Sequence, residues 1–202
     1  MFNQMKQQEL IQSLSQRELY LNLYLTQGIF LILTVILSIL FGQTFAEWRD
    51  LFQLDWITLL FWSVPVALFV VFIDVWLWLK VPKKWIDDGG INNRIFARIS
   101  VPHLLIVSIV IGLSEELLFR GLLQENIGYV ASSLLFAFMH VRYLSKPVLF
   151  IFVTALSFLL GWVFILTETL LIPIVIHILI DFVLGLIIRF DFFSIRSSQE
   201  HS

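Results

Sequence analysis

Six long apolar runs constrain the fold of this chain more than any other feature of its 202 residues. A bilayer core about 30 Å thick is crossed by about 20 apolar residues in a helix. Lipid offers backbone N–H and C=O groups no hydrogen-bond partner, and a helix satisfies them internally. The runs cover residues 21–41, 56–79, 101–123, 127–143, 148–166 and 170–188. They predict an all-α fold, a polytopic transmembrane helix bundle of about six spans.

The composition excludes several classes of protein. Apolar residues make up 59% of the sequence and charged residues 14%, against about 45–50% and about 25% in soluble domains. A soluble enzyme and a disordered tail are therefore excluded. Lysine and arginine (13) do not outnumber aspartate and glutamate (15), so no nucleic-acid partner is expected. Because there is no cysteine, any metal would be held by His, Asp or Glu.

The longest polar connection, residues 80–100, divides the chain. Residues 1–100 are predicted to hold an N-terminal surface helix, two spans and a basic cytoplasmic loop. A frayed polar tail is the alternative for residues 1–20. Residues 101–190 form a predicted core of four spans, and residues 191–202 form a polar tail.

Positive charge is concentrated in alternate connections. Lysine and arginine near span ends favour the cytoplasmic side, so we predict a multi-pass protein of the cell membrane with both termini cytoplasmic. Only Arg49 and Arg120 lie in the other segments. The residues that set this orientation are Lys6, Arg17, Lys80, Lys83, Lys84, Arg94, Arg98, Arg142, Lys146, Arg189 and Arg196.

Ionisable side chains are frequent in the last four runs, although each costs about 2.5–3.5 kcal/mol at mid-membrane depth for Asp, Lys or Arg. A functional site in the C-terminal half is therefore predicted. The first two runs contain only Asp74, which is expected at the membrane interface beside Trp76 and Trp78, with a proton relay or a substrate contact as the alternative. The side chains of the last four runs are Glu115, Glu116, Arg120, His140, His177 and Asp181.

A spacing of four residues places pairs of these side chains on shared helix faces. Glu116 and Arg120 form one pair, interpreted as a structural ion pair. Glu115 is turned away from it by about 100°, and this carboxylate is left free to take a proton as a general base. His177 and Asp181 form a second pair. The alternative is a salt-bridge network that only fixes helix register.

Three motifs occur in order on separate runs. Glu115 to Arg120 reads E-E-x-x-x-R, Phe136 to His140 reads F-x-x-x-H, and His177 to Asp181 reads H-x-x-x-D. This ordered set resembles the CPBP family, the CAAX proteases and bacteriocin-processing enzymes, also called the Abi family. The resemblance implies that residues 101–190 form the catalytic core of an intramembrane endopeptidase, a hydrolase.

The resemblance also implies residue roles. Glu115 and His140 would activate water, and His177 and Asp181 would stabilise the oxyanion. The remaining motif residues, Glu116, Arg120 and Phe136, would support them. Prenyl endopeptidases of this type carry Asn at the last position, and a carboxylate donates a hydrogen bond only when protonated. Either Asp181 is protonated, or it orients His177 and the imidazole alone is the donor.

Two alternatives accompany this interpretation. The family was named as metalloproteases, and Glu115, His140 and His177 would make a zinc ligand set with an open water position; the glutamate mechanism needs no ion, and no cofactor is expected. The substrate would be a membrane-associated protein or peptide, such as a lipidated C-terminus, a leader peptide or an anchored signal. The rival to the enzyme is a non-enzymatic membrane protein, a proton-coupled transporter or a regulatory or immunity partner, with a structural polar cluster.

Overall fold

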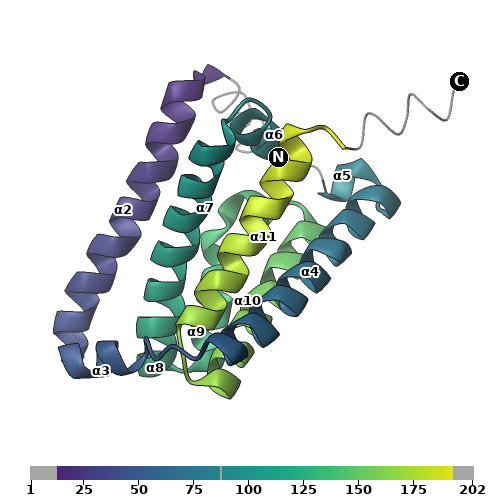
Figure 1. The fold of residues 1–202 in the computed structure, drawn as a ribbon. Helices are drawn as coiled ribbons and strands as arrows, with labels where there is room; N and C mark the ends of the chain where they lie inside the picture. Colours follow the sequence, from purple (N-terminus) through teal and green to yellow (C-terminus); the bar gives the residue numbers. More distant parts are fainter. Residues whose placement is uncertain (1–12, 87, 193–202) are drawn as a thin grey trace, which may run out of the picture.

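The computed structural model describes residues 13–86 and 88–192, and every regular element in these ranges is helical (Figure 1). The predicted all-α membrane bundle is confirmed. The long elements are α2 (Gln16–Phe41), α4 (Trp56–Lys80), α7 (Val101–Glu116) with its continuation through η1 (Leu117–Gln124) and α8 (Glu125–Ile127), α10 (Pro147–Thr167) and α11 (Leu171–Arg189). The short ones are α3 (Phe45–Asp50), α5 (Lys83–Ile86), α6 (Ile91–Phe96), α9 (Tyr129–Met139) and η2 (Val141–Tyr143).

All six apolar runs are helical, and five of them lie in helices of 19 to 27 residues that are long and apolar enough to cross a membrane. The run at 127–143 differs, because α9 has only 11 residues. At about 1.5 Å per residue it covers little more than half of a bilayer core. The predicted surface helix falls mainly on residues 1–12, and most of the polar tail on residues 193–202; both lie outside the described residues.

The early end of α9 has a cause in the sequence. The ring Nδ1 of His140 lies 2.9 Å from the carbonyl oxygen of Phe136, which an α-helix would pair with the backbone N–H of residue 140. That N–H turns instead to Ala137 O at 3.1 Å. The imidazole thus takes over a helical hydrogen-bond acceptor, and the chain leaves the helix at His140.

The two ends of the bundle differ in charge. The helices run alternately up and down, with α5 and α6 at one end and α3 and α8 at the other (Figure 1). Lys146 Nζ bonds Lys84 O at the first end, and Leu170 N bonds Leu51 O at the second. The start of α2 and the end of α11 also lie at the first end, where Gln16 Nε2 donates to Arg94 O of α6 and Arg189 Nη1 donates to Ile99 O. The basic connections gather there, while the second end carries Arg49.

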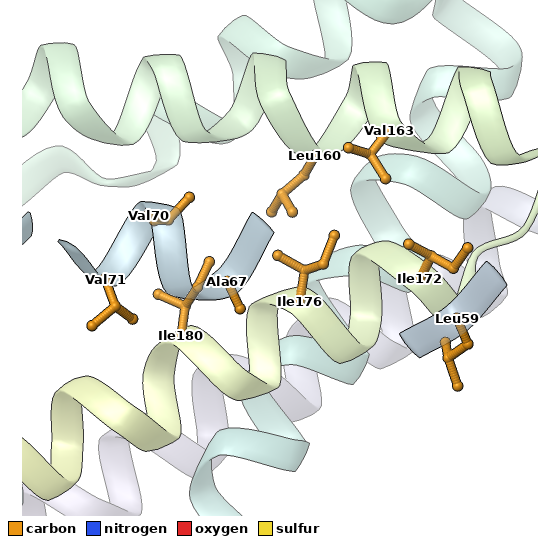
Figure 2. Packing of buried hydrophobic residues seen from close by; sticks show 9 residues of the cluster. All are labelled: Leu59, Ala67, Val70, Val71, Leu160, Val163, Ile172, Ile176 and Ile180. Carbon is orange, nitrogen blue, oxygen red and sulfur yellow. The ribbon is translucent and has the colours of Figure 1, made fainter. Parts of the chain in front are cut away.

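The core lies where α4, α10 and α11 meet (Figure 2). Aliphatic side chains from the three helices interdigitate there, whereas large apolar side chains on the outer faces of α2 and α4 are exposed. An apolar outside is what lipid requires. The buried residues of this cluster are Leu59, Ala67, Val70, Val71, Leu160, Val163, Ile172, Ile176 and Ile180.

Helices α7 and α11 approach each other closely, and this contact positions the polar residues. A Cβ on Gly112 would lie 2.8 Å from Ile178 Cγ1 and 3.2 Å from Ile178 N. Small residues allow such approaches between membrane helices. Gly112 precedes Glu115 and Glu116 on α7, and Ile178 follows His177 on α11, so the close contact brings carboxylates and imidazole to the same level.

Candidate active site

Glu116 lies at the centre of a buried polar network. Its Oε1 accepts from Arg120 Nη1 at 2.9 Å and lies 2.7 Å from Nδ1 of His177. The side chains of Glu116 and Arg120 are 0% and 1% exposed, so water does not compete for the hydrogen bond between them. The expected ion pair between Glu116 and Arg120 is present. The contact to His177 was not predicted, because it depends on how α11 packs against α7.

Arg120 is held by three further contacts. Its Nη2 donates to the carbonyl and the hydroxyl oxygen of Ser157 on α10, both at 3.0 Å. Its guanidinium carbon lies 4.4 Å from the ring centre of Phe136 on α9, a cation–π contact. Because buried charge needs such compensation, Arg120 and Phe136 tie three helices together around Glu116.

The segment that carries Arg120 is itself unusual. Residues of η1 form a π-helix eight residues long that continues α7 directly after Glu116. π-Helical turns are rare, and they are frequent at functional sites. A π-helix has more residues per turn than an α-helix, so the side chains after Glu116 point in directions different from those that a continuous α-helix would give them.

Glu115 is placed differently from Glu116. Its Oε1 accepts from Gln27 Nε2 of α2 at 3.3 Å, and Gln27 Oε1 accepts from Ser114 Oγ at 2.6 Å. The other oxygen, Oε2, is buried and has no hydrogen-bond partner among the described residues. Glu115 therefore offers an unsatisfied acceptor. Gln27 was not among the predicted site residues, because only charged side chains were considered. Its position as an amide within the apolar run 21–41 could have indicated it.

His177 presents its second nitrogen to two more carboxylates. Nε2 lies 3.8 Å from Asp181 Oδ2 and 4.0 Å from Glu115 Oε2. Since Nδ1 lies against Glu116, each nitrogen of the ring has a carboxylate neighbour. The pair of His177 and Asp181, which was expected from their spacing, therefore lies next to the two glutamates of α7.

His140 joins the group through Phe136. The Phe136 ring centre lies 4.8 Å from that of His140 and 6.2 Å from that of His177, so one aromatic ring lies beside both imidazoles. The carbonyl of Phe136 can only accept, so Nδ1 of His140 is the donor in their hydrogen bond. In the neutral ring, Nε2 then carries the lone pair.

Part of this network lines a cavity of about 880 Å³, whereas Glu116 and Arg120 lie behind its wall. Its wall includes Glu115, His140, His177 and Asp181, and it continues past residues of α5 and α6 toward the basic end of the bundle. Asp74, expected at the membrane interface, lies on the wall of this cavity. The site is therefore built from both halves of the chain, with α2 and α4 contributing polar groups.

The zinc hypothesis can be tested on this geometry. Within residues 13–86 and 88–192, no three His, Asp or Glu side chains are grouped closely enough to hold a metal ion. Nδ1 of His177 is engaged by Glu116, so only Nε2 of this ring could reach an ion shared with His140. Glu115, His140 and His177 as placed do not fit a zinc ligand set, which needs each donor about 2.0–2.2 Å from one ion.

Fold and site together define a class, the multi-pass helical membrane proteins in which carboxylates and imidazoles meet in a cavity between the helices. Residues 97–183 match the family model described as Type II CAAX prenyl endopeptidase Rce1-like. The chain is 40% identical over 161 residues to the uncharacterized protein YpbD of Bacillus subtilis (strain 168), a match covering 78% of this chain and 85% of YpbD. No solved structure matches it significantly.

The chain therefore belongs to the CPBP family of CAAX protease-like membrane proteins. The matched segment contains all three motifs that carried the resemblance. At the level of the family, the match supports a CAAX-type intramembrane protease. Gln27 and Asp74 lie outside the matched segment, so these two parts of the cavity wall are not covered by the family match.

Proposed function

We propose that this chain is an intramembrane endopeptidase that hydrolyses a peptide bond of a membrane-associated protein or peptide. The observation that carries the proposal is Oε2 of Glu115, which has no hydrogen-bond partner in residues 13–86 and 88–192 and lies on the wall of the cavity that also holds His140 and His177. A buried acceptor without a partner is costly, and such groups are retained where they act.

In the proposed reaction, Glu115 Oε2 accepts a proton from a water molecule that is also hydrogen-bonded to Nε2 of His140. The water oxygen forms a bond to the peptide carbonyl carbon, and the carbonyl oxygen becomes an oxyanion. The C–N bond then breaks, and the proton held by Glu115 passes to the leaving amine nitrogen. Such general acid–base catalysis contributes about 10²–10⁴-fold.

His177 serves as the oxyanion donor in this scheme. With Nδ1 donating to Glu116, Nε2 carries a hydrogen only in the imidazolium form. The carboxylates of Glu115 and Asp181, at 4.0 and 3.8 Å from Nε2, complement that positive charge. We therefore assign Asp181 the role of orienting His177, which is one of the two alternatives left open by the sequence.

The proposed substrate presents an extended segment, since a helical peptide bond must be unwound before water can attack it. It reaches the cavity from the bilayer or its surface, as a lipidated C-terminus, a leader peptide or an anchored signal does. Neither a nucleic acid nor a metal cofactor takes part in this scheme.

Cleavage of a peptide library by the detergent-purified protein tests the proposal. We expect Glu115→Gln and His140→Ala to lose at least about 100-fold in rate at unchanged thermal stability, and chelator to leave the wild type active. Glu125→Gln, an exposed carboxylate on α8, is the matched control and should keep full activity. Equal rates in all four proteins would refute the role of the cluster, and activity abolished by chelator and restored by zinc would refute metal-independent chemistry.

A further inference from the structure

Asp74 is a carboxylate on the cavity wall that the proposed chemistry does not use. It lies on α4, inside a span long enough to cross a membrane and six residues before the end of that helix at Lys80. Across the described ranges, its side chain makes no hydrogen bond, and no cation lies within 4.0 Å of it. Ionisable residues within spans are usually paired, so the partner of Asp74 is to be sought among molecules that enter the cavity.

The cavity wall carries more negative than positive charge. Among the described residues, five carboxylates and two basic side chains line it. Both basic side chains are engaged away from Asp74. Lys83 Nζ donates to Trp78 O at 2.9 Å, and Arg142 Nη2 donates to Asn92 Oδ1 at 3.0 Å. A concave wall of one sign attracts ligands of the opposite sign, so the cavity favours a cation. The carboxylates are those of Asp74, Asp88, Glu115, Asp181 and Asp191.

The same face of α4 already accommodates a lysine of the chain itself. Trp78 lies four residues after Asp74, so the two side chains share a helix face, and both line the cavity. The ammonium nitrogen of Lys83 lies 3.2 Å from the ring centre of Trp78, a cation–π contact. One cation is thus bound a single turn away from Asp74, while the carboxylate itself is unused.

Asp74 lies about one helical turn from the level of the proposed catalytic residues. Val71, three residues before it, belongs to the core cluster that contains Ile180 of α11, and Figure 2 shows these two side chains beside each other. Asp181 follows Ile180 directly. One turn is about 5.4 Å, and an extended chain covers about 3.3–3.6 Å per residue. Along the bundle, about two residues of an extended substrate therefore separate Asp74 from the cleaved bond.

A basic side chain of the substrate is the cation that suits this position. Lysine and arginine carry their charge at the end of a long apolar stem, which can lie along the apolar wall while the charged end meets a carboxylate. We propose that Asp74 binds a lysine or arginine side chain of the substrate, a few residues from the cleaved bond. This inference rests on the proposed peptidase function and narrows its substrates to segments with a basic residue near the cleavage site.

The test compares two decapeptide libraries that differ only in charge. One carries a single arginine, placed at each position in turn, and its twin carries citrulline, a neutral analogue of the same shape, in its place. Both are made with free and with acetylated N-termini. They are mixed with immobilised, detergent-purified wild type, Asp74→Asn and Asp50→Asn, and retained and cleaved peptides are quantified by mass spectrometry. Asp50 is the control, an exposed carboxylate of α3 that does not line the cavity.

We expect the wild type and Asp50→Asn to retain arginine peptides about tenfold or more over their citrulline twins, because hydrogen bonds to charged groups contribute about 1.5–3 kcal/mol. Asp74→Asn should retain both kinds equally and cleave citrulline peptides at the wild-type rate. A wild-type ratio of one would overturn the proposal, whatever the variants do. So would an Asp74→Asn protein that cleaves neither kind, because that loss belongs to a proton relay or to the fold.

Two further outcomes separate the proposal from its alternatives. The N-terminal amine is a second source of positive charge, and a preference that disappears on acetylation would overturn the assignment to a side chain. Retention that favours arginine without any cleavage would sink the peptidase and keep the cation site. Cleavage at equal rates with arginine and citrulline would do the reverse.

Discussion

At the scale of single residues, Gln27 holds the proposed general base from outside the family motifs. It donates to Glu115 Oε1 and accepts from Ser114 Oγ. Gln27→Ala removes the donor and leaves the carboxylate free to rotate. Because hydrogen bonds to charged groups contribute about 1.5–3 kcal/mol, we expect kcat to fall about tenfold or more with KM nearly unchanged, measured by steady-state cleavage of a library peptide.

The control for this prediction is Thr34→Val on the same helix. Thr34 is buried, and its hydroxyl bonds only the carbonyl of Phe30 among the described residues, so its loss affects stability without touching Glu115. An unchanged kcat in Gln27→Ala, or an equal fall in both variants, would remove Gln27 from the machinery.

Arg120 separates structural support from chemistry. Its removal leaves Glu116 as a buried carboxylate whose one remaining polar partner in the described part of the chain is the imidazole of His177. Breaking one side of a buried ion pair costs about 3–5 kcal/mol. We expect Arg120→Ala to unfold at much lower temperature in detergent, while Glu115→Ala, which removes an unsatisfied buried oxygen, keeps or gains stability at the cost of activity. Equal thermal stability in Arg120→Ala and wild type would show that the network is not structural.

The polar pairs within one helix were predictable, and those between helices were not. A step of four residues fixes the ion pair of Glu116 with Arg120, because helix geometry alone sets it. The contacts of Glu116 with His177, and of Glu115 with Gln27, depend on the rotation and shift of one helix against another. An apolar run does not encode those two quantities. The sequence therefore predicted a site in the C-terminal half alone, whereas Gln27 and Asp74 also line the cavity.

At the scale of the helices, the packing of α7 on α11 at Gly112 sets the level of the site. Gly112→Ala places a Cβ 2.8 Å from Ile178 Cγ1 and 3.2 Å from its backbone nitrogen. The backbone atom cannot move by a rotamer change, so α7 must shift away from α11. Overpacking of this kind costs about 1–3 kcal/mol, and we expect both a lower melting temperature and a loss of cleavage.

Gly28→Ala is the matched change on α2, since nothing lies within 4 Å of the added atom there. Alanine is favoured over glycine within a helix by about 0.5–1 kcal/mol, so this variant should be at least as stable as the wild type and fully active. If Gly112→Ala melts and cleaves like Gly28→Ala, the close approach of the two helices does not position the site.

Helix lengths were predictable to the extent that apolarity sets them. Five runs became helices close to their expected bounds, because lipid contact requires continuous helical hydrogen bonding. The sixth ended early at His140, where a side chain competes with the backbone for one carbonyl. Hydropathy does not report that competition, and the motif residue itself creates it.

At the scale of the whole molecule, the segregation of charge between the two ends predicts the orientation in the membrane. The basic end, where α5, α6 and η2 lie, should face the cytoplasm, because lysine and arginine resist translocation. The cavity continues toward that end, so the same orientation would admit substrates from the cytoplasmic side. Since the chain has no cysteine, single cysteines can report each end against a silent background.

Ser145→Cys at the basic end and Ala46→Cys on α3 are conservative changes at exposed positions. We expect a membrane-impermeant maleimide to label Ala46→Cys in intact cells and Ser145→Cys only after permeabilisation, with peptide cleavage unchanged in both proteins. The reverse labelling pattern would show the opposite orientation in the membrane, with the basic end and the cavity opening on the outer side. Labelling of both cysteines from one side would contradict the arrangement of the helices, because Lys146 at the start of α10 bonds Lys84 O at the basic end, whereas Leu170 just after its end bonds Leu51 O next to α3.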